Sequence, residues 1–346
     1  MTEILLSVFF ISVLLLFLST GVWVALSMIG VSTIAMTLFT SRPVGDAMAT
    51  TIWGTSSSWT LTALPLFVWM GEILFRTKLS ENLFEGLSPW MQKLPGGLIH
   101  VNVVGCALFA AISGSSAATV ATVGKMSIPE LRKRNYPEKI LLGSLAGSGT
   151  LGLLIPPSII LIIYGVTVQE SIAKLFVAGI IPGIMVALIF MSYVIFWSLI
   201  NKKQMPKIIE EYSIFEKIKR SKQLLPVIFL ISAVIGSIYT GIATATEAAS
   251  LGVVGALILS YFQKSLTLET FKTSLLGATK TSCMIAFILA GSTFLSLAMG
   301  FTGLPRNLAM WIQNMDLSPY VLIFVLMIFY IILGMFLDGI SAVVLT

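Results

Sequence analysis

The sequence predicts an all-α integral membrane protein with two inverted repeats, and three observations support this fold class. Only 10% of the 346 residues are charged, whereas a soluble globular chain carries about 25%. Hydrophobic residues make up 57% of the chain and the mean hydropathy is +0.98. Apolar runs long enough to span a bilayer recur, and a short glycine and serine pattern of the first half returns near the end.

The apolar runs define the expected membrane helices. The clearest are residues 4–18, 22–39, 61–75, 172–200, 224–239, 243–262 and 282–299. The first run begins at Ile4 with no basic residue before it, so it is interpreted as a retained helix and not as a secretory signal. Cys106 and Cys283 both lie in apolar stretches and are interpreted as small buried side chains.

The basic residues predict the topology. A net charge of +6 does not indicate nucleic acid here, because the basic residues gather in loops between apolar runs. Residues 125–139 and 201–222 hold 12 of the 21 Lys and Arg and are expected to be cytoplasmic. The N-terminus is then periplasmic. Residues 201–222 mix apolar and charged side chains, which predicts an amphipathic connector on the cytoplasmic membrane surface.

Residues 96–122 are predicted to form a re-entrant hairpin with its tip at residues 113–116. Two full crossings would need about 40 residues, more than this stretch provides. The sequence SGSS interrupts the apolar run at the tip. Irregular backbone at membrane depth is tolerated only where protein or water covers it, so the hairpin predicts a cavity.

Residues 1–200 and 223–346 are expected to form the two repeats. GSSA at residues 114–117 returns as GISA at residues 339–342, and the pair TG at 20–21 returns at 240–241. A second hairpin begins near 318–346, and the charge-based topology gives it the opposite orientation. Repeats of opposite orientation are typical of secondary transporters. The second repeat stops soon after its hairpin turn, so the chain is expected to be truncated at the C-terminus.

The hairpin tip and a nearby break predict a sodium site. Ser113 and Ser115 supply hydroxyls, and residues 152–158 form a broken helix whose two prolines leave backbone carbonyls without amide partners. The predicted ligands are Ser113, Gly114, Ser115, Gly152, Ile155 and Pro157. Two other interpretations stay open, a packing interface of small residues at the tip and a plain proline kink.

The second half predicts a related site. Gly241, Thr244 and Thr246 would face Gly339 and Ser341, and Gly241, Thr244, Gly339 and Ser341 are the predicted ligands of a second sodium ion. The alternative is that the threonine hydroxyl bonds the backbone of its own helix.

Organic anions need hydrogen-bond donors, which the starts of half-helices offer. The predicted substrate-binding residues are Ser115, Ser116, Ser158 and Asp338. Asp338 is an ionisable residue inside an apolar stretch and so a functional candidate, or else a helix cap. Glu72 lies four residues before Arg76, a spacing that favours a structural ion pair.

An enzyme is not indicated. The only histidine is His100, the sequence contains no GxSG, and Asp338 has no obvious carboxylate partner. A glycine loop with lysine for nucleotide phosphates is also missing.

Four segments occur in a characteristic order: AISGSSAAT from Ala111, GSGTLGLLIPPS from Gly147, YTGIATATEAA from Tyr239 and GMFLDGIS from Gly334. Together they resemble the large membrane subunit of tripartite ATP-independent periplasmic (TRAP) transporters, over essentially the whole chain. One departure is Ala245, where the family pattern has proline.

The resemblance implies an elevator-type transporter of the bacterial inner membrane, coupled to sodium ions and without an organic cofactor. It also implies a small TRAP membrane subunit, a periplasmic substrate-binding protein, and a small organic acid as substrate, such as a dicarboxylate, sialic acid or a sugar acid. The alternative is a standalone ion-coupled carboxylate carrier in the lipid bilayer, without a binding-protein partner.

Overall fold

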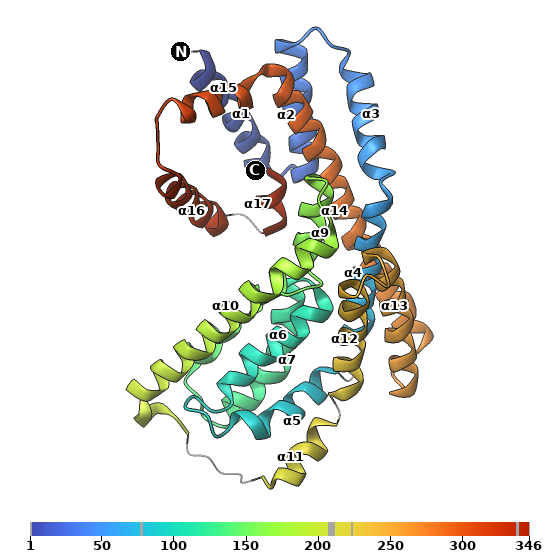
Figure 1. The fold of residues 1–346 in the computed structure, drawn as a ribbon, viewed down its shortest axis with the longest axis vertical. Helices are drawn as coiled ribbons and strands as arrows, with labels where there is room; N and C mark the ends of the chain where they lie inside the picture. The colour runs from blue at the N-terminus through green and yellow to red at the C-terminus, as the bar shows by residue number, and fades with distance from the viewer. Residues whose placement is uncertain (1, 77–78, 207–211, 223, 337–338, 346) are drawn as a thin grey trace. The chain divides into compact units, whose positions relative to one another are not determined.

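The computed structural model describes residues 2–76, 79–206, 212–222, 224–336 and 339–345. All regular elements in these ranges are helices, which confirms the predicted all-α class (Figure 1). Three described helices are long and apolar enough to cross a membrane by length and composition, or up to five if each bent helix pair counts as one span. Shorter apolar helices, such as Val24–Phe39 and Ile99–Ser113, add to these.

The chain divides into two compact units, residues 1–61 with 283–346 and residues 62–282. Each unit contains parts of both predicted repeats, so the repeat boundaries at 200 and 223 stay a prediction. The predicted hairpins also fall into different units. Residues 96–122 belong to the second unit, and residues 318–346 belong to the first.

The first unit is built around apolar packing between its N-terminal helices and the second half of α14. Its elements are α1 (Thr2–Ser19), α2 (Val24–Phe39), α3 (Val44–Ser56), most of the short helix η1 (Trp59–Thr62), the second half of α14 (Leu268–Thr302), α15 (Leu304–Gln313), α16 (Pro319–Phe336) and α17 (Gly339–Leu345). Phe10, Met36 and Phe294 share one buried cluster. A Cβ at Gly291 would lie 2.8 Å from the carbonyl oxygen of Ala25, so only glycine allows α14 to approach α2 this closely.

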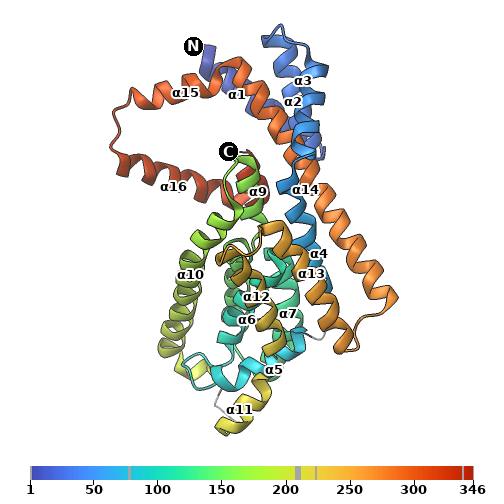
Figure 2. The same ribbon diagram turned by 45° about the vertical axis from the view of Figure 1, so that its right-hand side comes forward.

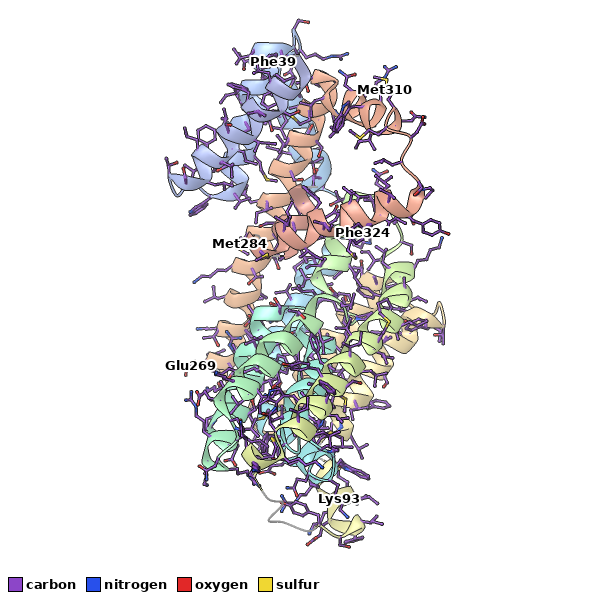
Figure 3. The ribbon with its side chains drawn as sticks, turned by 90° about the vertical axis from the view of Figure 1, so that its left-hand side faces the viewer. Phe39, Lys93, Glu269, Met284, Met310 and Phe324 are labelled. Atoms are coloured by element: carbon purple, nitrogen blue, oxygen red, sulfur yellow. The ribbon has the colours of Figure 1, made fainter. Side chains whose placement is uncertain are left out.

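Many apolar side chains of this unit lie on its surface. Phe39, Met284 and Phe324 are all exposed (Figure 3). Cys283 is exposed as well, so the prediction that both cysteines are buried is right for Cys106 and wrong for Cys283. The physical reason is that an apolar membrane helix turns part of its circumference outward, toward lipid.

The second unit holds the hairpin and its supporting helices. Its elements are α4 (Ala63–Phe75), α5 (Leu79–Met91), α6 (Ile99–Ser113), α7 (Ser116–Lys133), α8 (Glu138–Gly149), η2 (Thr150–Leu153), α9 (Ile159–Thr167), α10 (Ile172–Ile200), η3 (Lys202–Gln204), α11 (Ile214–Ser221), α12 (Leu225–Tyr239), α13 (Ala245–Phe262) and the first half of α14. Helices α6, α7 and α8 pack against one another, and α10 lies along α6 (Figure 1).

A buried polar seam joins α6 to α8. The Asn102 side-chain amide donates to the carbonyl of Leu141 at 3.2 Å and to the Ser144 hydroxyl at 3.1 Å. The Ser148 hydroxyl donates to the carbonyl of Asn102 at 3.4 Å. In an apolar interior such bonds fix the register between two helices, because an unpaired polar group there is costly.

Glycine also sets the packing of α4 on α13. A Cβ at Gly252 would lie 2.5 Å from the sulfur of Met70.

Thr244 is the N-cap of α13. Its hydroxyl accepts the Glu247 amide at 3.3 Å, and the Glu247 carboxylate accepts the Thr244 amide at 2.8 Å. This capping box satisfies backbone donors at the helix start. Glu247 is therefore engaged as a cap.

Candidate functional site

The turn between α6 and α7 forms the hairpin tip. Gly114 ends α6 with φ of 60°, a left-handed conformation that glycine adopts without steric cost. Ser115 is the N-cap of α7, and its hydroxyl accepts the Ala118 amide at 3.5 Å. The helix break thus falls inside the predicted tip at 113–116. Whether the hairpin enters and leaves the membrane on one side stays a prediction.

Three hydroxyl-bearing residues of the tip contact one another. The Ser113 Oγ lies 2.9 Å from the Oγ1 of Thr119 and accepts the Ser115 amide at 3.3 Å. Thr119 donates to the carbonyl of Ser115 at 2.7 Å, so toward Ser113 it acts as acceptor. A serine hydroxyl has one donor and two acceptor lone pairs. Ser113 therefore keeps one lone pair available for a cation.

Thr119 was not among the residues predicted from sequence. It is fully buried on the first turn of α7. Its spacing of four residues from Ser115 places both on one helix face, which is the signal that could have identified it.

The broken segment lies directly against this tip. A Cβ at Gly152 would sit 2.8 Å from the carbonyl carbon of Ser115. A Cβ at Gly114 would sit 2.9 Å from the carbonyl oxygen of Pro157. The Ile159 amide donates to the carbonyl of Gly114 at 3.3 Å. The structure thus brings Ser113, Gly114 and Ser115 together with Gly152 and Pro157.

Among the described residues, two carbonyl oxygens of the break have no partner, because the chain is not helical here and the Ile159 amide bonds the carbonyl of Gly114 instead. Within the described ranges, no donor bonds the carbonyl oxygen of Ile155 or of Pro157. Ile155 packs its side chain against the cluster of Val103, Ala110 and Leu151. Unpaired carbonyl oxygens and hydroxyls suit a monovalent cation, because they supply neutral oxygen ligands.

Ser158 is occupied otherwise. It precedes α9 and is fully buried, and its hydroxyl donates to the carbonyl of Leu153 at 2.6 Å. Ser116 is the first residue of α7, partly exposed. The substrate-binding roles of both residues, and of Ser115, stay predictions.

A cavity of about 110 Å³ opens beside the tip within the second unit. Its lining residues are Val68, Gly71, Glu72, Phe75, Ser113, Ser115, Ala118, Ile159 and Thr281. Gly71 permits the approach of α4, since a Cβ there would lie 3.0 Å from the Cα of Ser113. The polar part of the lining combines one carboxylate with three hydroxyls.

Glu72 forms an ion pair with Arg76, one helical turn later, and both side chains are 26% exposed. The pair agrees with the structural interpretation of this spacing. Among the described residues, no group of three or more His, Cys, Asp or Glu could hold a metal ion. The carboxylate in the cavity lining, that of Glu72, is thus already paired with Arg76.

The base of the hairpin is stabilised in a different way. The Leu98 amide donates to the Tyr136 hydroxyl at 3.0 Å, in the connection between α7 and α8. Burial raises the pKa of Tyr136 above its ordinary value, so the phenol stays neutral at physiological pH. Arg132 pairs with Glu138 across the same connection, and this bond raises the pKa of the Arg132 guanidinium.

The residues predicted for the second site belong to both units. Gly241 has φ of 71° and Thr244 caps α13, both in the second unit. Gly339 begins α17 and Ser341 is buried, both in the first unit. Asp338 lies outside the described residues. The second sodium site stays a prediction.

The sequence matches a known family of membrane proteins. The family described as tripartite ATP-independent periplasmic transporter, DctM component, matches residues 11–346. The C4-dicarboxylate TRAP transporter large permease protein DctM of Pseudomonas aeruginosa is 32% identical, covering 86% of this chain and 69% of that protein. DctM of Rhodobacter capsulatus is 31% identical over 90% of this chain and 74% of that protein. The sialic acid TRAP transporter large permease protein SiaM of Vibrio cholerae is 30% identical over 95% and 76%.

Apolar helices broken at a polar tip, together with these matches, define a multi-pass membrane permease and not an enzyme. The chain belongs to the DctM family, the large membrane subunits of TRAP transporters. This confirms the family suggested by the four ordered sequence segments.

Proposed function

We propose that this chain carries a small organic acid across the bacterial inner membrane, coupled to sodium, with the substrate delivered by a periplasmic binding protein. Relatives named for C4-dicarboxylates, 2,3-diketo-L-gulonate and sialic acid support an organic acid as substrate. The family supports a small membrane subunit as a further partner. The proposal includes an elevator-type movement, two re-entrant hairpins of opposite orientation and a periplasmic N-terminus.

One observation carries the sodium proposal: the hairpin tip that bears the Ser113 and Ser115 hydroxyls packs against a break in which the carbonyls of Ile155 and Pro157 have no donor within the described ranges. The ion would take the remaining lone pair of Ser113, with Ser115, Gly114 and the carbonyls of Gly152, Ile155 and Pro157 as further candidates. Because the same tip starts helix α7, whose amides can meet a carboxylate, bound sodium and bound substrate would favour each other.

The test is uptake against sodium concentration by the full-length protein with its partners, in proteoliposomes. Ser113→Ala and Ser115→Ala each remove one oxygen and should raise the sodium concentration at half-maximal uptake about tenfold. Ser260→Ala is the matched control, since Ser260 is also buried but only donates to the carbonyl of Ala256 within α13. Unchanged sodium dependence in both tip variants, at normal expression, would refute the site.

A second experiment addresses delivery. Uptake of free substrate should be slow until the binding protein is added. Equal rates with and without the binding protein would favour the standalone carboxylate carrier instead.

A further inference from the structure

Helix α11 carries an unusual concentration of positive charge. Lys217, Lys219 and Arg220 lie within its eight residues and Lys222 follows directly. The only acid in the helix, Glu216, accepts the Ser213 amide at 2.9 Å in the capping box. The single carboxylate is thus engaged at the helix start, and the basic side chains dominate the rest of the surface.

The same helix exposes an apolar face. Ile214, Phe215 and Ile218 are 73%, 74% and 49% exposed. Their spacing places them on one side of the helix. By helical spacing, Lys219 borders this face beside Phe215 and Lys217 borders it beside Ile214. Lys222 follows the helix on the side of Ile218, and Arg220 lies on the opposite side. Long basic side chains can run along an apolar surface while their charged ends reach the headgroup level.

Contacts with α5 fix which side of α11 faces outward (Figure 2). The Trp90 indole donates to the Ser221 hydroxyl at 2.8 Å, and Ser221 donates to the carbonyl of Gly86 at 3.3 Å. The Lys217 ammonium lies 5.4 Å from the centre of the Trp90 ring. Ser221 and Lys217 therefore lie against α5, while Ile214, Phe215 and Ile218 remain exposed.

Helix α11 is not continuous with the apolar helix α12, since the two are bent by 58° to each other. Trp90 on α5 and Tyr212, over whose ring the Arg220 guanidinium lies at 4.5 Å, are aromatic residues of the kind enriched at membrane interfaces. Among the residues whose exposure is described, the exposed acids on α5 and α11 are Glu85 and Glu216. Glu81 on α5 and Glu210 and Glu211 before Tyr212 are further acids in the sequence.

We propose that α11 and the adjoining end of α5 bind anionic phospholipid, with the basic side chains on the headgroup and Ile214, Phe215 and Ile218 in the acyl boundary. The charge selects an anionic lipid over a zwitterionic one. The open apolar face selects a lipid over a free phosphate. Apolar burial together with electrostatic attraction gives such helices their affinity for anionic membranes.

The test is native mass spectrometry of the purified full-length protein in a neutral detergent. Phosphatidylglycerol and phosphatidylcholine with identical acyl chains are titrated separately. Phosphatidylglycerol should bind more tightly to the wild type. The double variant Lys219→Gln with Lys222→Gln should bind phosphatidylglycerol roughly 25-fold more weakly, about fivefold for each lysine removed. Both lysines are exposed, so the fold and the Trp90 contact should be retained.

The matched control removes two exposed lysines elsewhere in the second unit, with Lys264→Gln and Lys272→Gln. It should bind phosphatidylglycerol like the wild type. Phe215→Gln should weaken both lipids without changing the charge, and glycerol 3-phosphate should not displace the lipid. The proposal is overturned if the wild type binds both lipids equally, or if the double variant and its control lose the same affinity. It is also overturned if Phe215→Gln loses no affinity, or if glycerol 3-phosphate displaces the lipid.

Discussion

The hydroxyl oxygens of Thr119 and Ser113 lie 2.9 Å apart across the first turn of α7. Thr119 also donates to the carbonyl of Ser115, so a single side chain supports both serines of the proposed sodium site. The orientation of the Ser113 lone pair therefore depends on a residue that need not touch the ion.

Thr119→Val keeps the shape of the side chain but removes its hydroxyl. Ser113 then loses the nearer of its two acceptors and keeps the carbonyl of Ser115 at 3.3 Å. The sodium concentration at half-maximal uptake should rise several-fold, consistent with about 1 kcal/mol for a lost hydrogen bond. Thr119→Ser keeps the hydroxyl and should have the wild-type sodium concentration at half-maximal uptake. Uptake measured against sodium concentration gives this value for both variants. If valine and serine at this position behave alike, Thr119 serves only packing.

Gly152→Ala should abolish transport. The added Cβ would meet the backbone of Ser115 and Ser116 at 2.8–3.0 Å, and backbone atoms cannot rotate out of the way. Gly143→Ala is the control, because nothing lies within 4 Å of a Cβ there. In α8 that change should leave uptake intact and stabilise the protein by up to about 1 kcal/mol. Uptake rates and thermal unfolding distinguish the two, and normal uptake by Gly152→Ala would contradict the close contact.

The Glu72 and Arg76 pair should show measurable coupling in a double-mutant cycle. Glu72→Gln, Arg76→Gln and the double variant are compared by thermal unfolding in one detergent. The coupling should be about 1 kcal/mol, above the value for fully exposed pairs because these side chains are partly buried. Additive effects of the two single variants would show that the pair contributes no stability.

The topology predicts that α11 faces the cytoplasm. A cysteine placed by Ser213→Cys, in a protein whose exposed Cys283 is changed to serine, should react with a membrane-impermeant thiol reagent only after the membrane is opened. Arg42→Cys in the same background should react in intact spheroplasts. Labelling in the reverse pattern would show that the whole chain has the opposite orientation to the one predicted.

Much of the fold could be predicted because a membrane helix needs a long apolar run, which is visible in the sequence. The runs at 172–200 and 22–39 correspond closely to α10 and α2. Helix α3 (Val44–Ser56) was not predicted, since its mixture of small and polar residues gives little apolar signal. Helix α14 starts at Leu268, 14 residues before the predicted 282, because Lys272 and Lys280 interrupt the hydropathy without interrupting the helix.

The site was predicted where local chemistry sufficed. Glycine, serine and proline identified both the tip and the break, because these residues act on the backbone at their own positions. The roles of Thr119 and Gly71 depend on which residues meet in space. Gly71 contacts the tip from another helix, so no local pattern could reveal it.

The bonds of Asn102 to α8 bear on how such proteins can be recombined. If segments were exchanged between this chain and a relative, a crossover between α6 and α8 would pair the Asn102 amide with the other parent's side chain at position 144. A side chain there without an acceptor would cost the amide one of its two bonds in an apolar interior. Functional hybrids should therefore inherit residues 99–149 from a single parent, as one indivisible cassette.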